Sequence, residues 1–345
     1  MEGDVMNFNF EALIGATINN QILLKKRNRK DDIRYAYKIE TNQGAFCLKA
    51  HHNGFTTVKR INDTARLIEK FNKIGFYSPR YSKWFDGSFS TAVISDGKEF
   101  IVWVEEFSEY KTANSDMLLE LPDIEMQKVE YLGRVSTGLM DYEFNYPSPY
   151  IMYSPFDSTT TTDEYEEFLE KVYAQLQNVN AVDIEILDHV RLFFYSKREE
   201  IKSKYVALPS SVFQSDLHAE NLVISNNKII GLIDFNLAGR EKVLNYFINE
   251  TAYQENNPIG KKWVSDDYIE THLQHFREKL KLFRKYYTLN ALEIDIIEDL
   301  YKVIVPYKFY PLTEIIGYAQ KNDFEEVNYR LQGMKKIIDK DLRLL

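Results

Sequence analysis

The chain has 345 residues, which is room for about two domains, and its 44% hydrophobic and 28% charged residues are typical of a globular protein. Because Cys47 is the single cysteine, an internal disulfide and a cysteine-based zinc cluster are excluded, and a reducing compartment is indicated. The 43 basic and 52 acidic residues give a net charge of −9, which argues against a partner such as duplex DNA. The acidic first residues do not resemble a signal peptide, and no apolar run approaches the length of about 18 residues that a membrane span needs. We therefore expect a cytoplasmic protein with neither nucleic acid nor a membrane as a partner.

The first hundred residues have the pattern of a β-sheet with one helix. Residues 35–40 alternate between apolar and polar side chains, as a half-buried strand does, and a tight turn at 42–44 leads into a returning strand at 45–49. Apolar residues at helical spacing predict a helix over 57–74, and a glycine and a proline just beyond it are the usual stop signals. Further strands are predicted at 21–24, 89–94 and 100–105.

After about residue 108 the pattern becomes mostly helical. Helices and one strand-like hairpin are predicted there, the helices at 164–176, at 183–204 and from 266 onwards, and the hairpin strands at 222–225 and 229–234. We therefore predict two lobes, a small β-rich lobe at 1–106 and a larger, mostly helical lobe at 107–345, with a ligand cleft between them. The first lobe has 16 basic and 13 acidic residues, a charge of +3, and the second has 27 and 39, a charge of −12.

Three polar residues at this hairpin have the types and the spacing that phosphoryl transfer needs. Asp216 and Asn221 form a D-x-x-x-x-N pattern, and Asp234 ends the second strand of the hairpin. The reaction needs one carboxylate to orient and deprotonate the attacking hydroxyl, and a second carboxylate with an amide oxygen to hold Mg²⁺ at the nucleotide phosphates. The short hairpin would bring the two metal ligands together on a rigid frame.

This stretch resembles the catalytic and metal-binding loops of the aminoglycoside phosphotransferase family, which includes choline kinase-like and homoserine kinase-like enzymes and shares the protein-kinase fold. The family pattern is H-G-D-x-x-x-x-N, a hairpin and then I-D-[FW], and here Gln214-Ser215 stands in place of the His-Gly pair. The resemblance implies an α+β, two-lobed protein-kinase-like fold. It also implies that Asp216 is the catalytic base and that Asn221 and Asp234 are Mg²⁺ ligands.

The resemblance extends upstream to Lys49. This lysine ends an apolar strand and resembles the kinase lysine that grips the α- and β-phosphates of the nucleotide. Its acidic partner on the following helix stays open at this point. The family's spacing leads to Asp63-Thr64, whereas Glu69 has the better side chain for such a pair.

Two further nucleotide contacts follow from the order of the elements along the chain. The turn that covers the phosphates would lie at 27–32, which is basic and lacks glycine. The base would hydrogen-bond to backbone groups at 104–107, which include Glu105 and Phe107. His218, two residues after the predicted base, would support the catalytic loop or touch the acceptor, and the first role is the one we favour.

The resemblance implies an ATP- (or GTP-) and Mg²⁺-dependent phosphotransferase that phosphorylates a hydroxyl of a small molecule, such as an amino sugar, a sugar or an amino alcohol. Because clefts lined by one charge concentrate ligands of the opposite charge, the −12 of residues 107–345 favours a neutral or cationic acceptor. One alternative is a protein kinase, against which stands the absence of an A-P-E sequence after Asp234. The other is a kinase-shaped structural or binding protein, similar to the spore-coat proteins that resemble this family.

Overall fold

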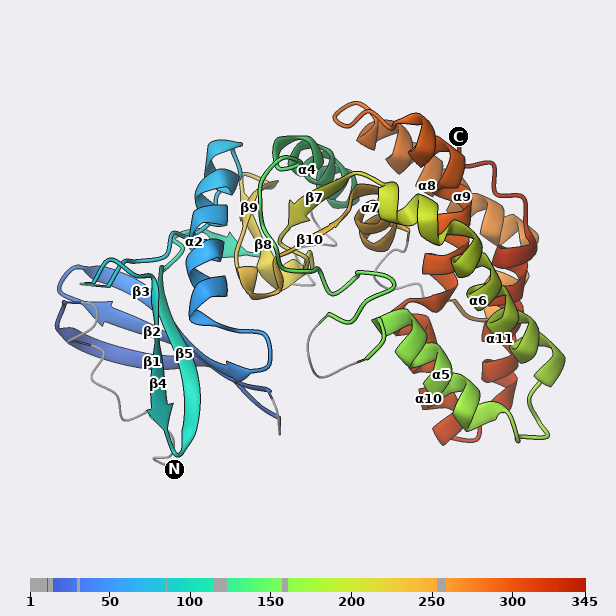
Figure 1. Cartoon of the computed structure of the whole chain (residues 1–345), viewed down its shortest axis with the longest axis horizontal. Helices are drawn as coiled ribbons and strands as arrows, with labels where there is room; N and C mark the ends of the chain where they lie inside the picture. Colours follow the sequence, from blue (N-terminus) through green and yellow to red (C-terminus); the bar gives the residue numbers. More distant parts are fainter. Residues whose placement is uncertain are drawn as a thin grey trace. The chain divides into compact units, whose positions relative to one another are not determined.

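The computed structural model describes residues 11, 15–29, 32–84, 86–113, 123–156, 161–252 and 259–345. These residues form two compact units. The first holds the described residues up to 113 together with Asp216–Ala238, and the second holds Asp123–Phe156, the described residues up to Ser215, and Gly239–Leu345. Strands and one long helix make up the first unit, and helices dominate the second (Figure 1). The predicted combination of a β-rich part and a helical part is confirmed, while the boundary at residue 106 stays a prediction.

The first unit is built on a five-stranded antiparallel sheet with the strand order β1-β2-β3-β5-β4. The strands are β1 (Ile18–Arg29), β2 (Asp32–Thr41), β3 (Gly44–Asn53), β4 (Ser90–Ser95) and β5 (Lys98–Glu106). β2 and β3 form the hairpin that the alternating sequence predicts. Its inward side chains, among them Tyr37, Ile39 and Leu48, are buried in the core of the unit together with Val102 and Val104 of β5.

The helix predicted after this hairpin is α2 (Val58–Lys73), which lies beside the sheet (Figure 1). It begins at Thr57, whose side chain accepts the N–H of Arg60, and this N-cap satisfies a backbone donor that would otherwise lack a partner. Its buried face is apolar except for Arg60 and Thr64. Phe71 packs edge-to-face on Phe235, with ring centroids 4.9 Å apart, so the helix also contacts the segment after the hairpin.

The predicted hairpin is present as β8 (Leu222–Ser225) and β9 (Lys228–Leu232), and β6 (Lys111–Thr112) extends it to three strands. Gly231 sets its position, because a Cβ there would lie 1.8 Å from the carbonyl oxygen of Tyr77. That close approach lets Tyr77 donate to Ile230 O and accept from Leu232 N, at 2.8 and 2.9 Å. The hairpin is thereby attached to the chain that follows α2.

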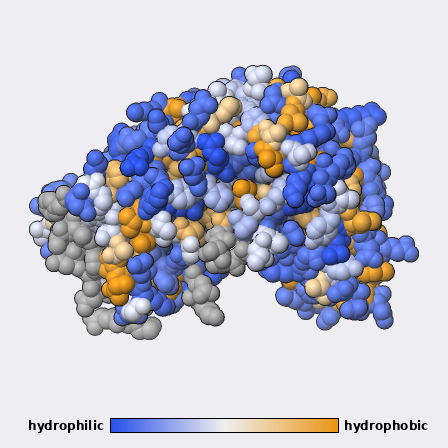
Figure 2. All heavy atoms as spheres, viewed as in Figure 1, coloured by the Kyte–Doolittle hydropathy of each residue, from blue (hydrophilic) through white to orange (hydrophobic). Residues whose placement is uncertain are grey.

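The second unit consists mainly of helices, and a two-stranded sheet among its described residues pairs β7 (Ser210–Phe213) with β10 (Gly239–Lys242). The helices are α4 (Ile124–Gly138), α5 (Glu164–Leu176), α6 (Ile184–Ala207), α7 (Val243–Thr251), α8 (Asp266–Phe283), α9 (Ala291–Ile304), α10 (Phe309–Gln320) and α11 (Phe324–Asp339). The described residues also include the short 3₁₀ turns η1 (Ala219–Asn221) and η2 (Phe235–Leu237) in the first unit, and η3 (Lys261–Val264) and η4 (Val305–Tyr307) in the second. None of the helices in the described ranges has both the length and the apolar character that crossing a membrane requires. Hydrophilic side chains predominate on the face shown in Figure 2.

Candidate active site

Lys49 on β3 lies between two carboxylates of the first unit. Its Nζ is 3.0 Å from Glu105 Oε1 and 3.0 Å from Asp234 Oδ1, and the Lys49 side chain is 10% exposed. Glu105 also accepts the indole N–H of Trp103 at 2.8 Å, so its carboxylate is fixed within the sheet. Burial alone would lower the pKa of Lys49, but Asp234 and Glu105 outweigh it and raise that pKa well above its ordinary value. The lysine is therefore held as a cation.

The acidic partner of Lys49 comes from the neighbouring strand β5, and the acids of α2 pair elsewhere. Asp63 contacts Lys59 and Arg66, each at 2.9 Å, and Glu69 contacts Arg80 at 3.2 Å. The open choice between Asp63-Thr64 and Glu69 is thus resolved by neither of them. In the register of β3 and β5, Lys49 stands opposite Trp103 and Cys47 opposite Glu105, which brings the lysine and the glutamate to one face of the sheet.

The buried charged residue of α2 is instead an arginine, Arg60. Its guanidinium Nη2 donates to the carbonyl oxygen of Ala238 at 3.0 Å. On the same face, Thr64 donates its hydroxyl back to the carbonyl of Arg60 at 2.8 Å. The helix therefore holds the segment that follows Asp234 through the Arg60 hydrogen bond and the Phe71–Phe235 contact. The glutamate that pairs with Lys49 lies on the sheet.

Asp216 and Asn221 meet across the short turn η1. The Asn221 Nδ2 donates to both the carbonyl oxygen and the Oδ2 of Asp216, each at 3.0 Å. His218 Nε2 lies 3.2 Å from Asp216 Oδ1, which is the loop-supporting position. Burial raises the pKa of Asp216, His218 lowers it and nearby Asp234 raises it, with a raised pKa as the result. A carboxylate with a raised pKa is a better proton acceptor, as a general base requires.

Ser215 and Asp234, at the two loops of the site, both have left-handed backbone conformations, with φ of 68° and 62°. Ser215 occupies the position where the family pattern has glycine, the residue that adopts this conformation without steric cost. Such backbone strain is common where side chains must be aimed at a ligand. Although burial raises the pKa of Asp234, the ion pair with Lys49 lowers it below its ordinary value, so Asp234 is ionised at neutral pH.

The oxygens of Asn221 and Asp234 suit a magnesium ion. The Asn221 side chain donates its hydrogen bonds to Asp216 through Nδ2, which leaves its Oδ1 as an acceptor. Among the described residues no three His, Cys, Asp or Glu side chains gather as a metal-binding group. Mg²⁺ is usually held by one or two carboxylates plus phosphates and water, so two protein ligands fit that ion and the chemistry of the donor set agrees with it.

The segments predicted to contact the base and the phosphates are mostly described. The N–H of Glu106 donates to Arg80 O at 2.8 Å and that of Phe107 to Ala45 O at 3.3 Å, so protein carbonyls accept both. The basic turn predicted at 27–32 belongs instead largely to two long strands, because β1 runs to Arg29 and β2 begins at Asp32; residues 30 and 31 lie outside the described residues. Base and phosphate contacts at these segments stay predictions.

Sequence reasoning missed the side-chain role of Glu105 and the nearby His51. His51 follows Lys49 by two residues, so its ring lies on the same face of β3, edge-on to Trp103 at 4.7 Å. Burial lowers the pKa of His51 to about 3, which makes it neutral beside the charged pair. The alternation of β3 could have placed His51, but the partner of Glu105 depends on strand register, which no local pattern gives.

Comparison with protein-family models finds no match for this chain, and comparison with curated proteins finds none either. Solved structures do match. An amicoumacin kinase in complex with AMP-PNP, Ca²⁺ and Ami is 16% identical, with 92% of this chain and 88% of that chain covered and a TM-score of 0.55. A microcompartment-associated aminopropanol kinase is 12% identical, with 94% and 95% covered and a TM-score of 0.54. An aminoglycoside phosphotransferase from Alicyclobacillus acidocaldarius is 11% identical, with 93% and 92% covered and a TM-score of 0.53.

These likenesses extend over nearly the whole chain and concern the fold. The chain has the fold of the aminoglycoside phosphotransferase-like kinases, with a β-sheet unit and a helical unit. The fold class that the motif at Asp216–Asp234 predicts is therefore confirmed.

Proposed function

We propose that this protein is a phosphotransferase that moves the γ-phosphoryl group of ATP or GTP to a hydroxyl of a small molecule, with Mg²⁺ as cofactor. The observation that carries the proposal is the connected set of side chains in the first unit. Lys49 pairs with Asp234, and Asp216 is bonded to Asn221 on the hairpin loop that leads to Asp234. Cation, metal-binding oxygens and base are the parts that phosphoryl transfer uses.

Each residue then has one role in the reaction. Lys49, fixed by Glu105, holds the phosphates of the nucleotide, and Asn221 with Asp234 holds Mg²⁺, which neutralises charge on the phosphate oxygens when it is bound. Asp216 accepts the proton of the acceptor hydroxyl. The hydroxyl oxygen forms a bond to the γ-phosphorus, the bond from that phosphorus to the bridging oxygen breaks, and the nucleoside diphosphate leaves with the electron pair.

The structure of the segment after Asp234 favours a small-molecule acceptor over a protein substrate. Helix α7 already begins at Val243, after the short elements η2 and β10. This leaves no room for the long activation segment that lies between the metal-binding aspartate and the A-P-E sequence of protein kinases.

We further propose that the acceptor is a neutral or cationic alcohol, such as an amino sugar, a sugar or an amino alcohol. The charge of −12 over residues 107–345 supports this, because an acidic surface concentrates cations. One of the matching proteins, the aminopropanol kinase, is named for an acceptor with an amine and an alcohol. A screen of such alcohols against anionic ones, with release of ADP as the signal, identifies the class.

The test of the activity is a pair of substitutions with different signatures. Asp216→Asn should leave nucleotide binding intact and lower turnover by about 10²–10⁴, the usual contribution of a general base. Asp234→Ala should abolish the Mg²⁺-dependent tightening of nucleotide binding in calorimetry, because it removes the carboxylate of the metal site. Glu220→Gln, an exposed acid in the same loop, is the control and should change neither. Wild-type turnover in Asp216→Asn, or unchanged Mg²⁺ dependence in Asp234→Ala, would refute the assignment.

A further inference from the structure

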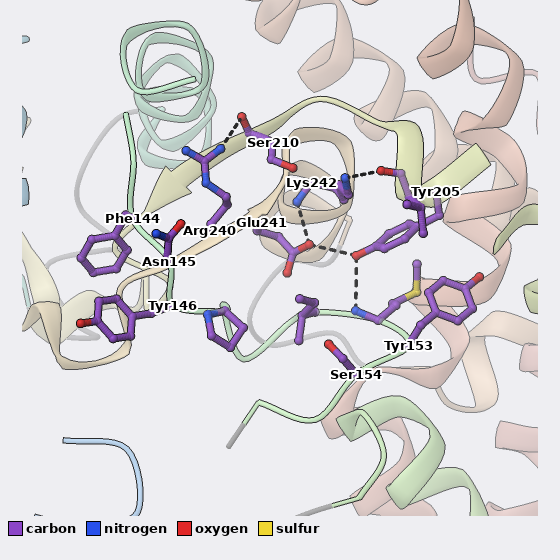
Figure 3. A pocket seen from close by; sticks show the side chains of 14 residues that line it. Phe144, Asn145, Tyr146, Tyr153, Ser154, Tyr205, Ser210, Arg240, Glu241 and Lys242 are labelled. Carbon is purple, nitrogen blue, oxygen red and sulfur yellow. Dashed lines mark hydrogen bonds between the residues drawn. The ribbon is translucent and has the colours of Figure 1, made fainter. Parts of the chain in front are cut away.

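The helical unit contains a cavity whose lining residues include none of the residues to which the proposed function gives a role. Its volume is about 450 Å³, and all the residues that line it belong to the second unit. The loop 144–154, the end of α6 and the strand β10 form its walls (Figure 3). The volume falls within the range of about 300–1,000 Å³ that is usual for small-molecule sites.

The wall of this cavity is mainly apolar and aromatic. Phe144, Tyr146 and Tyr205 contribute rings (Figure 3). Ile151 and Met152 contribute aliphatic surface. An apolar lining with a small number of polar groups is the usual composition of a ligand pocket, in which the polar groups fix the orientation of the ligand.

One oxygen of a buried carboxylate in the cavity has no hydrogen-bond partner among the described residues. Glu241 on β10 is 2% exposed, and its Oε1 accepts the Tyr205 hydroxyl at 3.0 Å and the backbone N–H of Lys242 at 2.7 Å. Its second oxygen, Oε2, is buried and has no hydrogen-bond partner among the described residues. A buried acceptor without a donor is energetically costly, so a group that donates to Oε2 would recover that energy.

The cations beside Glu241 do not supply the missing donor, because backbone carbonyls hold them. Arg240 donates to Met140, Tyr142 and Ser210. Lys242 Nζ donates to the carbonyl oxygens of Val206 and Leu208 at 2.7 and 2.9 Å. A cationic ligand would therefore be repelled by Arg240 and Lys242 and attracted by Glu241 alone, whereas an uncharged donor meets no such repulsion.

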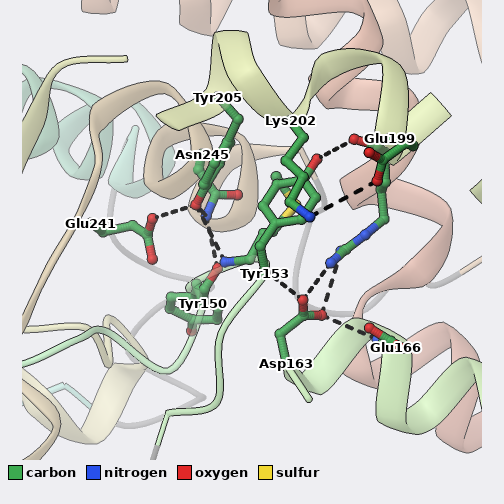
Figure 4. A network of polar contacts seen from close by, with 11 residues as sticks. Tyr150, Tyr153, Asp163, Glu166, Glu199, Lys202, Tyr205, Glu241 and Asn245 are labelled. Carbon is green, nitrogen blue, oxygen red and sulfur yellow. Dashed lines mark hydrogen bonds and ion pairs between the residues drawn. The ribbon is translucent and has the colours of Figure 1, made fainter. Parts of the chain in front are cut away.

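Tyr205 connects the floor of the cavity to its loop. Besides donating to Glu241, its hydroxyl accepts the N–H of Met152 at 3.3 Å and the amide of Asn245 at 3.4 Å (Figure 4). Farther along the loop, Tyr153 donates its N–H to Asp163 at 2.7 Å, and Asp163 forms a buried ion pair with Arg198. The wall is thus held by the protein itself, so the cavity is preformed.

We propose that this cavity binds an uncharged, mainly apolar small molecule whose hydroxyl or N–H group donates a hydrogen bond to Glu241 Oε2. Lys49, Asp216 and Asp234 are not among the residues that line this cavity. The inference does not depend on the proposed phosphotransferase activity, since it rests on the cavity and its unpaired oxygen.

Two isomeric probes test the hydrogen bond on the wild-type protein. 3-Methylindole carries the N–H donor, and 1-methylindole has the same atoms without it. Binding is measured by ligand-observed NMR titration. 3-Methylindole should bind saturably and about tenfold or more tightly than 1-methylindole, the worth of one hydrogen bond to a carboxylate. Equal affinities, no binding of 3-methylindole, or tighter binding of the cation benzylamine would each overturn the proposal.

Variants place the probe in this cavity. In Glu241→Gln the amide oxygen would take the two donors that Oε1 accepts now, and the amide NH₂ would face the cavity, so the preference for 3-methylindole should disappear. Ile151→Trp should abolish binding of both probes by filling the space, and it keeps the test valid if Glu241→Gln does not fold. Glu143→Gln, an exposed acid of the same loop, should bind like wild type. Unchanged binding of 3-methylindole to Ile151→Trp would refute the site.

Discussion

Replacing Glu105 with glutamine tests whether β5, and not α2, supplies the acid that positions Lys49. The change keeps the size of the side chain and removes its charge. Glu105 Oε1 lies 3.0 Å from Lys49 Nζ, and both side chains are at most 10% exposed. Lys49 keeps its second partner, Asp234, also at 3.0 Å, so the variant weakens the site without leaving an isolated charge.

The size of the effect follows from this geometry. Two unit charges 3.0 Å apart attract by about 5.5 kcal/mol at an effective dielectric constant of about 20. The desolvation of Glu105, which glutamine avoids, offsets part of this energy, and removal of one partner from a buried pair costs about 3–5 kcal/mol in proteins. Because Asp234 remains as a partner of Lys49, we expect the free energy of unfolding to fall by about 2–3 kcal/mol, at or just below the lower end of that range. With Lys49 no longer held between two acids, kcat/KM for the nucleotide should fall by about ten- to a hundredfold, since each factor of ten corresponds to about 1.4 kcal/mol.

Urea denaturation measures the free energy of unfolding, and ADP release at varied nucleotide concentration measures kcat/KM. Glu99→Gln makes the same substitution at an exposed site on the same strand and should change either by no more than about 0.5 kcal/mol. Asp63→Asn removes the α2 acid nearest the family's spacing, which pairs with the exposed cations Lys59 and Arg66, and should be equally mild. The reasoning fails if Glu105→Gln behaves like Glu99→Gln, or if Asp63→Asn reduces kcat/KM by tenfold.

Two further substitutions probe packing and pH dependence. Gly231→Ala would place a Cβ 1.8 Å from Tyr77 O and should lower the free energy of unfolding, measured by urea denaturation, by about 1–3 kcal/mol or more. Gly317→Ala, where a Cβ would have no atom within 4 Å, should be neutral or stabilising. Similar losses for the two variants would show that the hairpin is not held as described. Burial raises the pKa of Glu241 from 4.5 to about 7 in the folded state, against the opposing effect of Asn245, so the unfolded state loses its proton first and folding stability falls as pH rises from about 4.5 to 7. Glu241→Gln removes this penalty, and its stability relative to wild type should increase by roughly 3 kcal/mol between pH 4 and pH 8, from 2.5 pKa units at about 1.36 kcal/mol each. A difference that does not change with pH would contradict the burial of this carboxyl.

The elements with a strong local period could be predicted from the sequence. The helix expected at 57–74 is α2 (Val58–Lys73), and the strands expected at 222–225 and 229–234 are β8 and β9. The apolar spacing of such segments decides which face is buried, and that decision is local. The strand predicted at 21–24 is shorter than β1, because β1 continues through polar residues to Arg29 and pairs with β2 along its length.

The partners of the site residues could not be predicted in the same way. Glu105 and Lys49 are 56 positions apart, and their contact depends on the register between β3 and β5. The family pattern led instead to an acid on α2, where Thr64 stands on the buried face. The unpaired oxygen of Glu241 is also invisible in sequence, because it results from three chain segments that together leave a space.

The position of Glu105 changes what α2 does in this fold. In protein kinases the lysine pairs with an acid on the helix, so movement of the helix controls the grip on the nucleotide. Here Lys49 and Glu105 belong to adjacent strands of one antiparallel sheet, and backbone hydrogen bonds between β3 and β5 fix the distance between them. α2 contributes Arg60, which donates a hydrogen bond to the carbonyl of Ala238, four residues after Asp234, the proposed metal ligand. A shift of α2 would therefore disturb the metal side of the proposed site first and leave Lys49 paired with Glu105, which suits an enzyme whose lysine is in place before any substrate arrives.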